Sequence, residues 1–285
     1  MTRPATVIAV LALCFVPSWA WAAAIRDEPA IPADAESAVD RLNNSPRHGE
    51  WVDIVEGRGD HGGWNDSVRA WVSYPERATT APVVIVIHEI FGLTDWIRAV
   101  ADQLAGAGFI AIAPDLLTGV GAAGETPEDP QEAIKLVRGL RIEDVTRRLT
   151  AVARYGSSLP AANGRFGTVG FCWGGGTSFA FAGHDMDLSG AVVYYGRTPE
   201  AEILGKISAP VIGFYGGDDA RVNATIPLAE SEMSRAEQSY TKNVFEGAGH
   251  GFLRQQSGRD GANLDATKAA WPATVEFLKE HLETE

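Results

Sequence analysis

A cysteine at an expected strand-to-helix turn is the strongest chemical signal in this sequence. Residues 170–174 read Gly-Phe-Cys-Trp-Gly, the thiol form of the G-x-S-x-G turn that exposes a nucleophilic serine. An apolar, strand-like segment precedes the turn and a helical segment follows it, which is the context that such a turn requires. The amino terminus of a helix favours a thiolate, the reactive form of cysteine. We therefore predict that Cys172 is a nucleophile rather than a buried structural thiol.

A thiol nucleophile needs a base within hydrogen-bond reach and a carboxylate to orient that base. In folds with this turn the chain order is nucleophile, acid, histidine. His184, His250 and His281 all follow Cys172. His184 is only about a helix length beyond the turn, and His281 falls on a C-terminal amphipathic helix. His250 follows a short strand in a glycine-rich loop, so we predict that it is the base.

The acid is expected after an earlier strand at the same sheet edge. Residues 214–220 read Phe-Tyr-Gly-Gly-Asp-Asp-Ala and supply two candidates, Asp218 and Asp219. Both cannot point at one imidazole, so one of them belongs to a solvated turn or caps the next helix. The local pattern leaves both assignments open.

A third element at this edge carries a possible oxyanion site. Residues 87–92, Ile-His-Glu-Ile-Phe-Gly, end the first fully apolar stretch. Hydrolases built this way place an oxyanion-hole amide there. We predict the backbone N–H groups of Ile90 and Trp173 as the paired donors for a tetrahedral oxyanion. His88 is interpreted as a structural residue at a strand end.

Glu89 lies in the same segment and has two possible roles. Beside Cys172 in a partly dry pocket, its carboxylate could exchange a proton with the thiol. Alternatively, Glu89 is a strand-end residue paired with Arg98. The pattern favours the first role.

The elements that must position these residues alternate along the chain. Residues 68–74 alternate apolar and polar side chains, which indicates a half-exposed strand near a sheet edge. Other stretches are continuously apolar, as in strands buried on both faces of a parallel sheet: 82–87, 109–113, 166–171, 190–195 and 210–215. Amphipathic segments separate them: 94–107, 132–155 with a break at Gly139, 177–182, 224–236 and 266–281. This order predicts a doubly wound, mostly parallel α/β sheet with ligands at its carboxyl edge.

The N-terminus has the features of an export signal. Arg3 precedes an apolar run at 7–16 and an Ala-Trp-Ala site at 20–22, so we predict a secretory signal peptide over 1–22 and an exported, periplasmic or secreted protein. Cys14 would be removed with it. Residues 23–50 are expected to form a loosely packed N-terminal arm, and residues 51–285 a single domain.

Composition excludes several classes of protein. With 37 acidic and 24 basic residues the net charge is −13, which argues against binding to nucleic acid or anionic membranes. Two cysteines, Cys14 and Cys172, are too few for a four-cysteine zinc site or a disulfide-rich scaffold. We expect no cofactor and no metal, a small-molecule substrate as partner, and a monomer or small homo-oligomer.

Ordered segments of the chain resemble the dienelactone hydrolases (carboxymethylenebutenolidases), cysteine-nucleophile members of the α/β-hydrolase superfamily. The likeness runs from about residue 82 to 278 and includes 88–92, 113–116, 170–175, 194–196, 216–219 and 248–252. The resemblance implies the α/β-hydrolase fold and selects Asp219 as the acid. It also implies that Glu89 deprotonates the thiol when substrate arrives and that Arg254 holds a substrate carboxylate.

The sequence departs from this family in the helix before the turn. Members that act on dienelactone carry a second carboxylate-binding arginine, a tyrosine and a tryptophan there, where this chain has Pro130, Ile134 and Val137. Arg138 could substitute for the arginine. We expect a hydrolase that cleaves a small ester or lactone through a thioester. The alternatives are a thioesterase or general carboxylesterase on the same triad, a non-catalytic binding protein of the same fold and, more weakly, a thiol redox protein.

Overall fold

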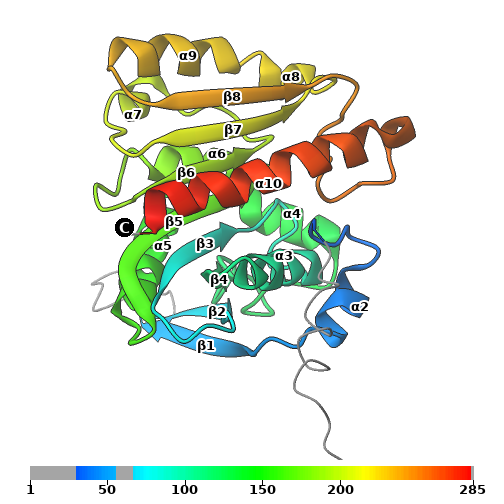
Figure 1. The fold of residues 1–285 in the computed structure, drawn as a ribbon, viewed down its shortest axis with the longest axis vertical. Coiled ribbons are helices and arrows are strands. Elements are labelled where there is room, and N and C mark those ends of the chain that lie inside the picture. The colour runs from blue at the N-terminus through cyan, green and yellow to red at the C-terminus, as the bar shows by residue number, and fades with distance from the viewer. Residues whose placement is uncertain (1–29, 56–66, 284–285) are drawn as a thin grey trace, which may run out of the picture.

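A single eight-stranded sheet forms the centre of the protein (Figure 1). The computed structural model describes residues 30–55 and 67–283, so the predicted signal peptide at 1–22 lies outside the described residues. The strands follow the order β1-β2-β4-β3-β5-β6-β7-β8. Their bounds are β1 Gly49–Val55, β2 Ser67–Ser73, β3 Ala81–Ile87, β4 Ile110–Pro114, β5 Ala162–Phe171, β6 Ala191–Tyr194, β7 Val211–Gly216 and β8 Tyr240–Phe245.

The direction of the strands creates one common edge. β2 runs antiparallel to both β1 and β4, whereas each neighbouring pair from β4 through β3, β5, β6 and β7 to β8 is parallel. The carboxyl ends of these parallel strands therefore meet at one side of the sheet, where ligand sites form in such folds. The predicted doubly wound α/β sheet is confirmed.

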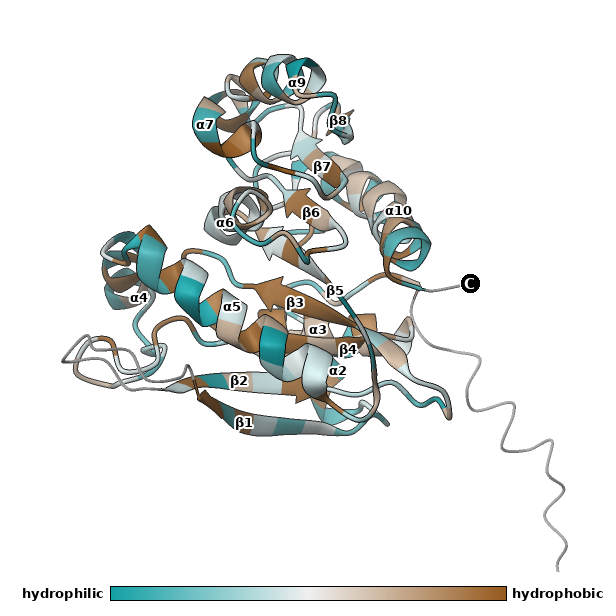
Figure 2. Cartoon of the chain, turned by 90° about the vertical axis from the view of Figure 1, so that its left-hand side faces the viewer, coloured by the Kyte–Doolittle hydropathy of each residue, from teal (hydrophilic) through white to brown (hydrophobic). Residues whose placement is uncertain are grey.

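Helices cover both faces of the sheet, and its central strands β3, β4, β6 and β7 are strongly hydrophobic, whereas the edge strands β1 and β8 carry more polar residues (Figure 2). Val84 and Val86 of β3 face one apolar cluster, with α3 (Asp95–Gly106) and α10 (Ala262–Leu282). Val83 and Ile85 face the other, with α5 (Ile142–Ser158), α6 (Trp173–Phe181) and α9 (Ile226–Arg235). The other helix bounds are α2 Ala38–Asn43, α4 Pro130–Arg138, α7 Ala201–Leu204 and α8 Ala220–Asn223, with a 3₁₀ turn, η1, at Arg259–Gly261. The predicted break at Gly139 is confirmed, because α4 ends immediately before it.

Residues 30–48 pack more closely than the sequence suggested. Ala33 and Ala38 are buried, and the indole of Trp96 donates to the carbonyl of Ala33 at 3.0 Å. The amide of Gln256 donates to the carbonyl of Pro32 at 2.9 Å. The expectation of a loosely packed arm is therefore wrong for this part, because short buried contacts rather than a periodic apolar pattern hold it. Within residues 30–55 and 67–283, no helix combines the length and apolarity needed to cross a bilayer.

A buried ion pair ties this arm to α3. Arg47 Nη2 lies 2.5 Å from Asp102 Oδ2, and the two side chains are only 6% and 5% exposed. Arg47 Nε donates to Asp102 Oδ1 at 3.1 Å, and the hydroxyl of Ser45 donates to the same oxygen at 2.6 Å. Removal of one partner would leave a buried charge without compensation, which is more costly than loss of an exposed pair.

We therefore predict that Asp102→Ala lowers the free energy of unfolding by about 3–5 kcal/mol. Asp95→Ala on the same helix removes a more exposed pair with Arg98 and should cost about 1 kcal/mol or less. Urea denaturation of both variants measures the difference. Equal destabilisation by the two variants would show that the buried pair does not anchor the arm.

Candidate active site

The backbone at Cys172 is strained in the way that a nucleophile turn requires. Cys172 has φ 55° and ψ −112° and stands between the end of β5 and the start of α6. A Cβ on Gly170 would lie 1.9 Å from the carbonyl oxygen of Gly174, and a Cβ on Gly174 would lie 2.3 Å from that of His88. Neither position can hold a side chain without a shift of the backbone. The turn therefore depends on both glycines and presents Cys172 at the carboxyl edge.

Cys172, His250 and Asp219 form a continuous chain of contacts. The Sγ of Cys172 lies 3.1 Å from Nε2 of His250, and Nδ1 of His250 lies 2.5 Å from Oδ2 of Asp219. Three different strands, β5, β8 and β7, end just before these residues. The arrangement has the geometry of a nucleophile, a base and an orienting acid.

The two aspartates have different environments. Asp219 is buried and also accepts a 3.4 Å hydrogen bond from the backbone of Val222 at the start of α8. Asp218 is exposed and pairs instead with Arg259 at 3.0 Å. The structure thus brings Asp219, and not Asp218, to the imidazole.

The other two candidate histidines lie elsewhere, His184 beside a polar cavity and His281 against Phe277.

Electrostatics favour a charged imidazole in this chain. Burial acts to lower the pKa of His250, but its hydrogen bonds with Asp219 and Cys172 outweigh burial and raise that pKa to about 9. Burial acts to raise the pKa of Asp219, but the hydrogen bond and charge of His250, together with the Val222 amide and Arg221, outweigh burial and lower it. At neutral pH a cationic His250 therefore faces the sulfur of Cys172.

Glu89 is a buried carboxylate with a cationic partner. It is 3% exposed, and its Oε2 lies 2.7 Å from Nε of Arg254. Burial raises the pKa of Glu89 to about 7, against the opposing charges of Arg254 and His250. Arg98, the alternative partner, pairs with Asp95. Glu89 is therefore poised to gain or lose a proton near neutral pH.

The amides of Ile90 and Trp173 are available as donors. Both residues line the same cavity as Cys172. Among the described residues, neither backbone N–H donates to a carbonyl in the loop and turn contacts, and Trp173 is the first residue of α6, where amides have no partner inside the helix. Two unpaired amides beside a nucleophile are what an oxyanion hole requires.

The cavity at Cys172 has a volume of about 650 Å³ and a cationic side. Arg138, Arg197 and Arg221 line it, and none of the three takes part in the ion pairs of the described residues. Arg138 was considered from the sequence, whereas Arg197 and Arg221 were missed. Their positions just after β6 and β7 were the available signal, because both strands end at the ligand-binding edge.

Arg254 lies on the other side of Glu89. With Glu89 it lines a separate cavity of about 610 Å³, to which Ala35 and Val39 of the arm also contribute. Its guanidinium also lies over the ring of Phe91, 5.0 Å from the ring centroid. Arg254 does not line the cavity at Cys172, so its predicted role in holding substrate stays a prediction.

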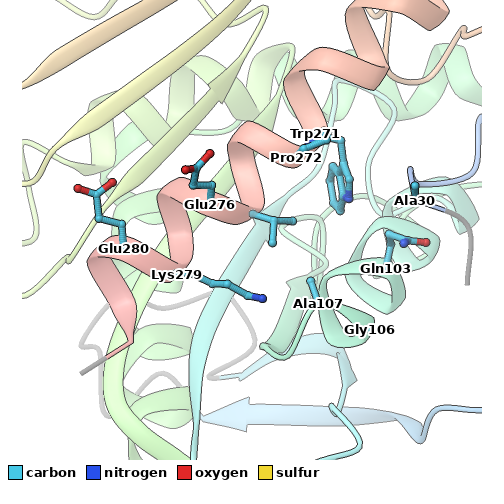
Figure 3. A pocket seen from close by; sticks show the side chains of 10 residues that line it. Ala30, Gln103, Gly106, Ala107, Trp271, Pro272, Glu276, Lys279 and Glu280 are labelled. Atoms are coloured by element: carbon cyan, nitrogen blue, oxygen red, sulfur yellow. The ribbon is translucent and has the colours of Figure 1, made fainter. Parts of the chain in front are cut away.

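Another cavity, of about 790 Å³, lies between α3 and α10 (Figure 3). Trp271, Pro272 and Lys279 line it together with Gln103, and its lining contains no cysteine or histidine. Its volume alone therefore does not make it a reaction site.

No cluster of three or more His, Cys, Asp or Glu side chains suited to a metal occurs within the part of the chain that the structure describes.

Comparisons with known proteins agree with this geometry. The family model for the dienelactone hydrolase family matches residues 68–282. Carboxymethylenebutenolidase 1 of Cupriavidus pinatubonensis is 31% identical over 222 residues, which cover 72% of this chain and 90% of the relative.

Solved structures share the fold. A dienelactone hydrolase-like promiscuous phosphotriesterase from metagenomic libraries has a TM-score of 0.69 at 24% identity, covering 83% of this chain and 99% of the other. The dienelactone hydrolase of Anabaena variabilis has a TM-score of 0.62 at 21% identity, with the same coverage of both chains. The protein therefore belongs to the dienelactone hydrolase family, hydrolases of ester and lactone bonds built on the α/β-hydrolase fold.

Proposed function

We propose that this hydrolase cleaves a small ester or lactone through a thioester on Cys172. The observation that carries the proposal is the chain from Cys172 Sγ to His250 Nε2 at 3.1 Å and from His250 Nδ1 to Asp219 Oδ2 at 2.5 Å. A sulfur nucleophile with an oriented imidazole is suited to acyl transfer. Thioesterase and general carboxylesterase activities would use the same groups, so the choice among them depends on the substrate.

Acylation begins with removal of the thiol proton. Glu89 accepts this proton as the substrate arrives, since its pKa of about 7 matches the task. The thiolate attacks the carbonyl carbon, and the amides of Ile90 and Trp173 stabilise the oxyanion. The carbon–oxygen bond then breaks, and the departing oxygen takes a proton from His250.

Deacylation uses water as the second nucleophile. His250, now neutral, takes a proton from water while the oxygen of that water attacks the thioester. The carbon–sulfur bond breaks, the carboxylic acid leaves, and the proton held by Glu89 returns to the Cys172 thiolate. Asp219 keeps the imidazole oriented and stabilises its charged form in both half-reactions.

The substrate is proposed to carry a negative charge. Arg138, Arg197 and Arg221 line the cavity at Cys172, although the chain has a net charge of −13. Guanidinium groups bind carboxylates with strong, directional hydrogen bonds. A carboxylate that reached Arg254 would have to compete with Glu89 for it, and this competition would free Glu89 to accept a proton.

The nucleophile assignment predicts the effect of removing the thiol. Cys172→Ala should lower kcat/KM at least about a thousandfold on every substrate that the native enzyme turns over. A panel of lactones, aryl esters and thioesters at equal enzyme concentration measures this and identifies the preferred class. Unchanged turnover by Cys172→Ala would refute the nucleophile, and no turnover by the native enzyme would favour a binding protein.

The two shifted groups predict a bell-shaped dependence of kcat/KM on pH. Activity should fall below a pKa of about 7, where Glu89 becomes protonated and cannot accept the thiol proton. It should also fall above a pKa of about 9, where His250 becomes neutral and cannot protonate the leaving oxygen. Glu89→Gln should lower kcat/KM by about 10²–10⁴ and abolish the acid limb. Glu128→Gln, an exposed residue of the same cavity as Glu89, is the control, and an unchanged acid limb in Glu89→Gln would contradict the assignment.

The cationic side of the cavity predicts selectivity for anionic esters. Arg138→Ala, Arg197→Ala and Arg221→Ala should each lower kcat/KM about tenfold or more for an aryl ester with a carboxylate on its acyl chain. The same variants should leave the uncharged aryl ester of equal length within about threefold, because its recognition loses no charge-assisted hydrogen bond. Arg235→Ala, far along α9 and paired with Glu232, is the control. Equal effects on both esters would rule out charge recognition here.

A further inference from the structure

His88 is a buried ionisable residue that the proposed reaction does not use. It follows the last residue of β3 and is fully buried. Its Nδ1 lies 2.7 Å from the carbonyl oxygen of Glu89, whereas Nε2 makes no hydrogen bond with any described residue. A carbonyl oxygen can only accept, so Nδ1 carries the proton and donates. Burial lowers the pKa of His88, which agrees with a neutral ring protonated at Nδ1.

The bond from His88 fixes the orientation of one oxyanion donor. The carbonyl of Glu89 and the N–H of Ile90 belong to the same peptide group, which is planar and trans. The two therefore point in opposite directions. The backbone N–H of Gly92 also donates to the Glu89 carbonyl, at 3.2 Å. With the carbonyl held by these two donors, the N–H of Ile90 is directed away from them, and Ile90 lines the cavity at Cys172.

The same ring contacts the residue that carries the other donor. The imidazole of His88 is stacked on the indole of Trp173, with ring centroids 5.4 Å apart and planes 20° from parallel. The backbones of His88 and Gly174 also approach each other closely, since a Cβ on Gly174 would lie 2.3 Å from the carbonyl oxygen of His88. His88 is therefore in contact with both segments that supply an oxyanion amide.

We propose that His88 is a positioning residue that sets the two oxyanion donors, Ile90 by a hydrogen bond and Trp173 by stacking. This inference rests on the proposed function, because it needs a tetrahedral oxyanion at Cys172. The proposal also explains why a histidine stands here although its buried Nε2 has no hydrogen-bond partner among the described residues. A buried acceptor without a partner is destabilising. A Phe at this position would avoid that destabilisation, but it could not donate a hydrogen bond to the Glu89 carbonyl.

The two contributions of His88 can be separated by substitution. His88→Phe keeps a stacking ring and loses the donor. His88→Asn loses the ring and keeps an amide nitrogen close to the place of Nδ1, whereas His88→Gln puts its amide nitrogen close to the place of Nε2. The readouts are kcat and KM on an aryl ester and the rate at which iodoacetamide alkylates Cys172. Alkylation forms no oxyanion, so it reports on the thiol and on the groups that exchange a proton with it, His250 and Glu89, and not on the oxyanion donors.

His88→Phe should lower kcat about 10²–10³-fold, the effect of losing one oxyanion donor, with KM and the alkylation rate within about threefold of the native values. His88→Asn should restore kcat to within about tenfold of the native enzyme, and His88→Gln should not. Cys172→Ala is measured in parallel.

If His88→Phe had the kcat of the native enzyme, the inference would be overturned. A parallel loss of kcat and alkylation rate would also overturn it, because that result indicates general disruption of the site. Should His88→Phe be insoluble, equal kcat in His88→Asn and His88→Gln would overturn it instead. Retained turnover in Cys172→Ala is a different result and would refute the proposed function itself.

Discussion

The left-handed backbone at Cys172 is the constraint on which the site depends. A φ of 55° is unfavourable for a residue with a side chain, so the surrounding structure has to hold it. The close approach of Gly170 to Gly174 and of Gly174 to the end of β3 does so. As a result, Sγ projects from the carboxyl edge toward His250, and the first amide of α6 is left free beside it. The proposed nucleophile and one proposed oxyanion donor thus come from one strained turn.

Two pairs of ionisable side chains lie near this turn. His250 and Asp219 form the inner pair, in which mutual hydrogen bonding overcomes the effect of burial on the pKa of the imidazole. Glu89 and Arg254 form a second pair, in which burial prevails and keeps the pKa of the carboxyl near neutrality. The chain as a whole is acidic, so the cluster of Arg138, Arg197 and Arg221 at the cavity is a local departure that surface composition does not explain.

Much of the fold and of the candidate site could be predicted from the sequence, because its apolar stretches indicate where the strands end. The G-x-C-x-G turn, the aspartates after β7 and the histidine after β8 follow apolar stretches directly, and a parallel sheet brings such ends together. The edge strand β1 was not predicted, since most of its residues are exposed or half-buried and it joins the sheet through its backbone ladder with β2. The packed residues 30–48 were not predicted either, since single hydrogen bonds and one ion pair hold them without a periodic pattern.

Two features of the site depend on contacts between different elements of the fold, which a local sequence pattern cannot predict. The pairing of Glu89 with Arg254 rather than Arg98 joins residues far apart in the chain. The position of His88 between the Glu89 carbonyl and Trp173 depends on how the end of β3 packs against the turn at Cys172. Its sequence position at a strand end suggested a structural residue, but could not show that its ring contacts the Glu89 carbonyl and Trp173.

The most direct test of the central claim is intact-protein mass spectrometry after rapid acid quenching during turnover of an ester that the enzyme hydrolyses. A thioester on Cys172 predicts a transient mass increase equal to the acyl group, located on the peptide that contains Cys172 and removed by neutral hydroxylamine. An acyl group on another residue, or steady turnover with no acylated enzyme at any quench time even for an activated aryl ester, would contradict it.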